Sequence, residues 1–154
     1  MTHILLVDEN PTQARISSRI LEQENLTVTV AATLQDGVRV AVEGHFDLII
    51  TDLVLPGGSG IELCRQIREA RGNGTPVIVR TSRGTPTNVL EGLSAGVASY
   101  MARDLSPAEM IARIRNVLAV QPDPEAEGAR SFTAEFAVLR RGTDRSIRRF
   151  ASFL

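Results

Sequence analysis

The sequence predicts an α/β fold in which five parallel strands form one doubly wound sheet. Short apolar runs alternate five times with longer segments whose apolar residues recur at helical spacing. The connections between these segments are too short for anything but right-handed crossovers. Strands joined in this way carry helices on both faces of a parallel sheet.

The N-terminal unit begins with a continuous apolar strand over residues 4–7, which ends in Asp8 and Glu9. Asn10 can cap a helix and Pro11 suits the first helical position, so a helix is expected to start here. Its expected core-facing stripe consists of Ile16, Ile20 and Leu21.

The next two units supply the second strand, the second helix and the central strand. Residues 26–30 alternate between apolar side chains and threonine, which is typical of a strand with two different faces. Thr33 can cap the following helix, and Gly44 can end it. Residues 48–51 show no alternation and are expected to be covered on both faces. Asp52 follows at the carboxyl end of this central strand.

The C-terminal half of the predicted sheet continues the alternation. A helix with Cys64 on its apolar stripe is expected to stop by Gly72, and a strand over residues 76–81 ends in Thr81. The remaining elements are a helix over 85–95, a short strand over 97–101 and a helix over 107–119.

Acidic residues end two strands that are expected to be neighbours. The carboxyl ends of the first and third strands meet at the switch point of such a sheet, so Asp8, Glu9 and Asp52 should converge there. Three carboxylates repel one another, and oxygen ligands are those that Mg²⁺ prefers. The alternative is a solvated acidic rim. A hydroxyl and a cation at the ends of the next two strands, Thr81 and Arg103, favour a site instead.

Four separated motifs resemble those of response-regulator receiver domains of two-component phosphorelays, similar in layout to the chemotaxis response regulator. The motifs are LLVDEN, DLVLPGGSG, PVIVRT and AGVASYMARDLSPAEM, and the resemblance covers about residues 2 to 120. It implies a flavodoxin-like (βα)5 fold. It also implies a phosphoprotein that takes a phosphoryl group from a histidine kinase or a histidine phosphotransfer protein.

The resemblance also implies a role for each matching residue. Asp52 would be the phosphoryl acceptor, Thr81 and Arg103 would assist at the phosphoryl group, and Thr81 and Tyr100 would form the switch. The Mg²⁺ ligands would be Asp8, Glu9, Asp52 and the main-chain carbonyl of Val54. Apart from this chemistry at Asp52, no enzyme activity is expected.

The sequence departs from the family pattern at several of these positions. Arg103 stands where a lysine is usual, and Asp104 stands where a proline normally follows. We therefore predict a trans peptide bond after Arg103, with its side chain still reaching Asp52. Arg80 occupies a position where the pattern is apolar, and Glu9 is longer than the common aspartate.

These departures leave two functions from different classes. The first is a phosphorylatable switch that passes a change of shape to a partner. The second is a receiver-like interaction or dimerisation module that has lost phosphorylation because Arg80 and Arg103 disturb the site. Binding of beryllofluoride, a mimic of the acyl phosphate, would discriminate between them.

Composition limits the partners and the compartment. The chain has 154 residues, a net charge of -1, one cysteine and no lysine. The charge argues against a general attraction to nucleic acid or anionic membrane. The single cysteine and the lack of a membrane-spanning run or basic N-terminal flank favour a cytoplasmic protein. A homodimer is one open alternative.

The domain organisation changes after residue 120. Residues 1–120 are expected to form the receiver domain, and residues 121–130 a proline-rich, acidic linker. Residues 131–154 hold four of the five phenylalanines and five of the 17 basic residues. So short a segment cannot build a core alone, and it is either an appendage that packs on something else or the stub of a longer protein.

Overall fold

The computed structural model of the chain describes residues 1–72, 74–82 and 86–120. The linker and the appendage expected at 121–130 and 131–154 lie outside the described residues.

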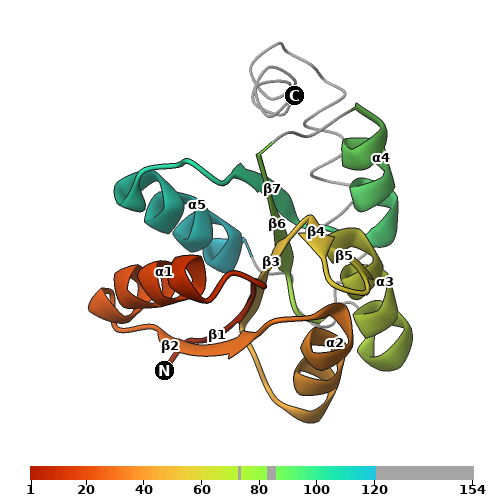
Figure 1. The fold of residues 1–154 in the computed structure, drawn as a ribbon, viewed down its shortest axis with the longest axis horizontal. Helices are drawn as coiled ribbons and strands as arrows, with labels where there is room; N and C mark the ends of the chain where they lie inside the picture. Colours follow the sequence, from red (N-terminus) through yellow and green to blue (C-terminus); the bar gives the residue numbers. More distant parts are fainter. Residues whose placement is uncertain (73, 83–85, 121–154) are drawn as a thin grey trace.

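One parallel sheet of five strands runs through the middle of the molecule in the order β2-β1-β3-β6-β7 (Figure 1). The order reverses at β1, so the switch point lies between β1 and β3. This confirms the predicted doubly wound sheet. The strands are β1 (His3–Val7), β2 (Thr27–Ala31), β3 (Leu48–Asp52), β6 (Val77–Thr81) and β7 (Ser99–Ala102).

The register of the sheet aligns three charged residues. Val7 lies opposite Thr51, and Asp52 lies opposite Arg80 on the other side. Asp8 follows Val7 directly, so Asp8, Asp52 and Arg80 form a row across the carboxyl ends of three neighbouring strands. The sheet therefore brings the candidate site together without help from long loops.

Helices cover both faces of the sheet (Figure 1). Leu5, Val7 and Ile49 belong to the buried apolar cluster on the side of α2, α3 and α4. Ile4, Leu6 and Ile50 belong to the cluster on the side of α1 and α5. The helices are α1 (Pro11–Gln23), α2 (Leu34–Glu43), α3 (Gly60–Arg71), α4 (Pro86–Ala95) and α5 (Pro107–Ala119). Among the described helices, none is long and apolar enough to cross a membrane.

The helix ends follow the predicted signals. The Asn10 side chain accepts hydrogen bonds from the backbone N–H groups of Thr12 and Gln13, and Thr33 caps α2 in the same manner. Ser106 and Glu109 add a cap that was not among the sequence predictions, a reciprocal capping box at the start of α5. Such a cap contributes about 1 kcal/mol to helix stability.

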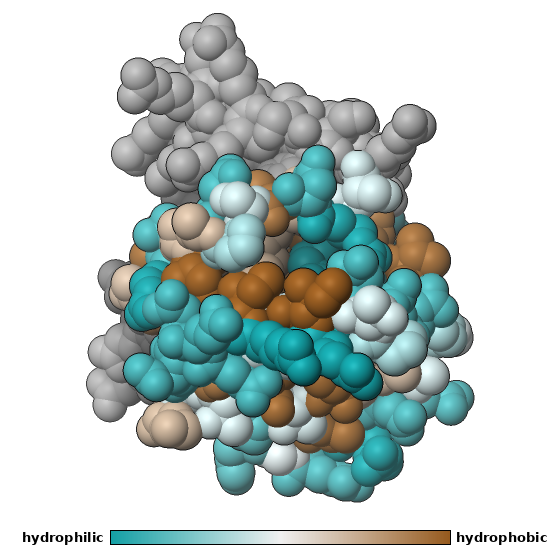
Figure 2. Space-filling model, turned by 60° about the vertical axis from the view of Figure 1, so that its left-hand side comes forward, coloured by the Kyte–Doolittle hydropathy of each residue, from teal (hydrophilic) through white to brown (hydrophobic). Residues whose placement is uncertain are grey.

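The expected inner stripe of α1 was partly wrong. Ile16 is 49% exposed, whereas Ala14, Ser17 and Leu21 are buried. These three residues recur at i, i+3 and i+7, so they share one helical face. Figure 2, in which the left-hand side of Figure 1 comes forward, shows apolar side chains gathered in a band between hydrophilic ones. The inward position of Ser17 matters for the site.

A small two-stranded antiparallel sheet follows β3. It consists of β4 (Val54–Leu55) and β5 (Gly58–Ser59). Gly57 between them has a φ of 92°, a left-handed conformation that favours glycine. The hairpin leads directly into α3, whose first turn is capped by Ser59.

Candidate functional site

The two central carboxylates lie buried at the carboxyl ends of adjacent strands. Asp8 is 2% exposed and Asp52 is 1% exposed. The burial of both carboxylates follows from the sequence, because each comes at the end of an apolar strand whose two faces are covered by helices. Buried carboxylates need partners, since an unpaired buried charge is costly.

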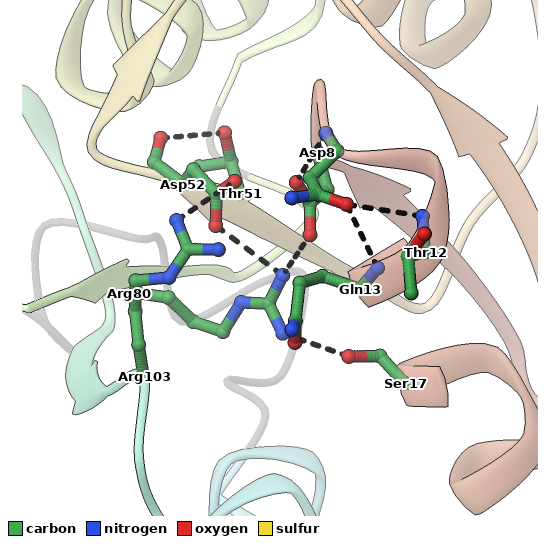
Figure 3. Close-up of polar contacts among 9 residues, drawn as sticks. Asp8, Thr12, Gln13, Ser17, Thr51, Asp52, Arg80 and Arg103 are labelled. Atoms are coloured by element: carbon green, nitrogen blue, oxygen red, sulfur yellow. Dashed lines mark hydrogen bonds and ion pairs between the residues drawn. The ribbon is translucent and has the colours of Figure 1, made fainter. Parts of the chain in front are cut away.

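Arg80 of β6 is the partner that both carboxylates share (Figure 3). Its Nη2 atom lies 2.9 Å from Asp8 Oδ2 and 3.2 Å from Asp52 Oδ1. Its Nη1 atom donates a hydrogen bond of 3.0 Å to the hydroxyl of Ser17 on α1. The guanidinium is thus held between two strands and a helix, and the residue is only 6% exposed.

The remaining carboxylate oxygens also face donors. Asp8 Oδ1 accepts a 2.9 Å hydrogen bond from the backbone N–H of Asn10, the residue that caps α1. Asp52 Oδ2 lies 3.3 Å from Arg103 Nη1, and the Arg103 side chain is 37% exposed. Arg103 therefore reaches the acidic pocket as predicted. No peptide bond in the described part of the chain is cis, so the expected trans bond after Arg103 is confirmed.

Burial dominates the electrostatics of Asp52. Desolvation by burial raises the pKa of Asp52 from 3.8 to about 6, and a hydrogen bond with Asp8 and the negative charge of Asp8 act in the same direction. The charges of Arg80 and Arg103 oppose this rise without overcoming it. Asp52 Oδ1 and Arg80 Nε have no hydrogen-bond partner among the described residues, although Oδ1 lies at ion-pair distance from Arg80. At neutral pH the Asp52 carboxyl group is therefore mainly ionised, and its Oδ1 atom has an ion-pair contact but no hydrogen bond.

Thr81 and Tyr100, the expected switch residues, are both buried. Thr81 follows Arg80 at the end of β6 and is 4% exposed. Tyr100 on β7 is fully buried and lies inward, with its hydroxyl against Gly92 of α4. Burial raises the pKa of Tyr100, so its phenol is neutral. Tyr100 is already buried in this structure, so the movement of its side chain on phosphorylation stays a prediction.

The expected magnesium ligands are only partly brought together. Glu9 is exposed, and the Val54 carbonyl as a ligand stays a prediction. Within residues 1–72, 74–82 and 86–120, no group of three or more His, Cys, Asp or Glu side chains is placed to hold a metal ion. Asp8 and Asp52 have the right oxygen chemistry for Mg²⁺, but a guanidinium lies between them. The arrangement therefore does not fit a divalent cation as it stands.

Two members of the site were not identified as such from the sequence. Arg80 was noted as a departure from an apolar pattern and, in one of the two alternatives, as a residue that disturbs the site, but not as a partner of both carboxylates, and Ser17 was not singled out. The signal for Arg80 was a charge within the last two residues of a buried strand, which needs a counter-charge nearby. Ser17 has no such signal, because a serine among helix residues usually points to solvent.

The fold and the buried carboxylates at the carboxyl ends of β1 and β3 have the layout of a receiver-type signalling domain. A family model described as the response regulator receiver domain matches residues 4–115. The chain belongs to this family, and it is a receiver domain of the kind found in two-component response regulators.

Named relatives agree with this family. The transcriptional regulatory protein ResD of Bacillus subtilis is 37% identical over 117 residues, which are 76% of this chain and 48% of that protein. The response regulator ArlR of Staphylococcus aureus is 36% identical over 125 residues, 81% of this chain and 56% of that protein. The chain thus spans about half the length of these curated relatives.

A solved structure supports the same fold. The crystal structure of a CheY-like receiver domain protein from Methanospirillum hungatei has a TM-score of 0.75 and 28% sequence identity. The match covers 79% of this chain and 96% of that one. Receiver domains generally bind Mg²⁺ at their acidic pocket, which makes the position of Arg80 in this chain a notable difference.

Proposed function

We propose that this receiver domain accepts a phosphoryl group on Asp52. The observation that carries the proposal is the position of Asp52, a buried carboxylate at the end of the central strand with Arg103 on one oxygen. A histidine kinase or histidine phosphotransfer protein would supply the group. An Asp52 oxygen would attack phosphorus, the bond from phosphorus to the imidazole nitrogen would break, and the imidazole would leave with the electron pair.

The residues around Asp52 have groups suited to the acyl phosphate. Its new negative charge needs cations and hydrogen-bond donors. Arg103 already lies 3.3 Å from Asp52 and is partly exposed, so it can turn toward a phosphoryl oxygen. The Thr81 hydroxyl at the end of β6 would donate a hydrogen bond to a phosphoryl oxygen. The response of Tyr100 would then change the surface formed by α4 and β7.

Mg²⁺ remains a prediction for this chain. Asp8 and Asp52 would hold the ion, with Glu9 and the Val54 carbonyl as further ligands, and the ion would neutralise phosphoryl charge. Such binding requires the Arg80 guanidinium to leave the space between the carboxylates.

A second function, a receiver-like interaction module without phosphorylation, draws support from one observation. Arg80 is paired with both carboxylates and anchored on Ser17, so the pocket is internally neutralised before any ligand arrives. Such a module would act through its surfaces, including homodimer contacts. A cytoplasmic location fits either function.

Beryllofluoride binding tests the proposal, because this ion mimics an acyl phosphate on a carboxylate. Backbone amide NMR spectra should be recorded with beryllofluoride, both with Mg²⁺ and with a chelator. We expect shifts at residues around 52 and in residues 89–102, with none in Asp52→Asn. Spectra unchanged under both conditions would favour the interaction module, and shifts confined to the vicinity of residue 52 would contradict the Tyr100 switch.

A further inference from the structure

Arg80 is a buried cation near the carboxyl end of β6, where close partners must compensate for its desolvation. Its side chain is 7% exposed, and those of Asp8 and Asp52 are 0% and 2% exposed. Removing such charges from water costs several kcal/mol per ion unless close partners offset it. The short contacts of Arg80 Nη2 with both carboxylates supply that offset.

The guanidinium is fixed from a third side. Ser17 of α1 is 6% exposed, and its hydroxyl accepts the hydrogen bond from Arg80 Nη1. Figure 3 shows the Arg80 side chain extending from its strand past Asp52 toward Asp8 and Ser17. Helix, strand and carboxylates thus hold the cation in one place.

A divalent cation and this guanidinium compete for the same oxygens. Asp8 Oδ2 and Asp52 Oδ1 both face Arg80 Nη2, while Asp8 Oδ1 is taken by the Asn10 N–H and Asp52 Oδ2 by Arg103. Two carboxylates and two guanidinium groups already balance in charge. An added Mg²⁺ would meet two like charges at close range, which disfavours its binding.

We infer that Arg80 is a built-in counter-cation that takes the place of the divalent metal between Asp8 and Asp52, so that the pocket of this protein binds Mg²⁺ only weakly. The inference concerns the same pocket as the proposed function, but it does not depend on phosphorylation. Metal titration without any phosphoryl donor reads it separately.

The decisive variant is Arg80→Met, which keeps an unbranched apolar stem and removes the cation. Mg²⁺ affinity should be measured by isothermal titration calorimetry on the full chain. We expect Arg80→Met to bind Mg²⁺ at least about tenfold more tightly than the wild type, because Asp8 and Asp52 then face each other with only the partly exposed Arg103 as a counter-charge. Adding Asp52→Asn to Arg80→Met should abolish the gain.

Arg65→Met is the matched control. Arg65 lies on α3, is 43% exposed and pairs with Glu62 rather than with the pocket. It also loses one guanidinium from the chain, so any general effect of net charge appears in it equally. Its Mg²⁺ affinity should equal that of the wild type.

Two further measurements keep the test decisive. Where Arg80→Met is unfolded without metal, recovery of its far-ultraviolet circular dichroism on adding Mg²⁺ supports the inference. Ser17→Ala, which removes only the anchor of Arg80, should tighten Mg²⁺ binding by a smaller factor than Arg80→Met. Equal Mg²⁺ affinity in the wild type and Arg80→Met would overturn the inference, as would unchanged affinity in Ser17→Ala where Arg80→Met does not fold with Mg²⁺.

Discussion

Burial of Asp52 should make the protein less stable as its carboxyl group ionises, and Asp52→Asn should remove this pH dependence. The folded pKa of about 6 lies above the ordinary value of 3.8. The folded state therefore binds more protons than the unfolded state between these pH values. At about 1.4 kcal/mol per pH unit, the wild type should lose about 3 kcal/mol relative to Asp52→Asn as pH rises from below 4 to 7. The side chain is only 2% exposed, so solvent screening reduces this value little.

Urea denaturation followed by circular dichroism, at a series of pH values, measures the difference between the two proteins. The difference should grow through the window from about pH 4 to 6 and level off above it. Asp36→Asn, at an exposed carboxylate of α2 that pairs with Arg39, is the control and should show no such trend. A difference that stays flat, or that grows in favour of the wild type, would show that the arginines outweigh burial and would refute the reasoning.

Three other predictions follow from single contacts. Gly92→Ala should destabilise the protein and expose Tyr100, because the new Cβ would meet the Tyr100 hydroxyl. Tyr100 is the only tyrosine and tryptophan is absent, so acrylamide quenching of tyrosine fluorescence measures the exposure of this side chain. Unchanged quenching together with higher stability would contradict this prediction. Cys64, whose pKa burial raises to about 11, should react with a thiol reagent at pH 8 far more slowly in the folded than in the urea-unfolded protein, and equal rates would argue against the packing. The two arginines that pair with Asp52 should contribute differently to the free energy of unfolding measured by urea denaturation. Arg103→Met should lower it by at most about 1 kcal/mol because Arg103 is partly exposed, and Arg80→Met should lower it by about 3 to 5 kcal/mol. Similar losses in the two variants would count against the described burial of Arg80.

Much of the fold could be predicted because local signals and topology agree. Asn10 and Thr33 cap helices as predicted, and uninterrupted apolar runs form the central strands. Once the strand order is assumed, the neighbouring positions of Asp8 and Asp52 follow from the switch point. These elements depend on residues close together in the sequence or on general rules of sheet topology.

The contents of the pocket could not be predicted in the same way. Apolar periodicity on α1 favoured Ile16 as the inward residue, whereas the buried partner of Arg80 is Ser17. The hydroxyl faces inward because a guanidinium from β6, 63 residues away in sequence, needs an acceptor there. A contact of this kind depends on the packed position of two elements, and no local pattern reports it.

Phosphorylation of Asp52 is the measurement on which the proposed function depends most directly. The full chain should be incubated with phosphoramidate, a small phosphoryl donor, in Mg²⁺ and separately in chelator, and then analysed by intact-protein mass spectrometry. We expect the wild type to gain the mass of one phosphoryl group and Asp52→Asn to gain none. A wild type that gains no such mass under either condition, or an Asp52→Asn variant that gains it equally, would contradict Asp52 as the phosphoryl acceptor.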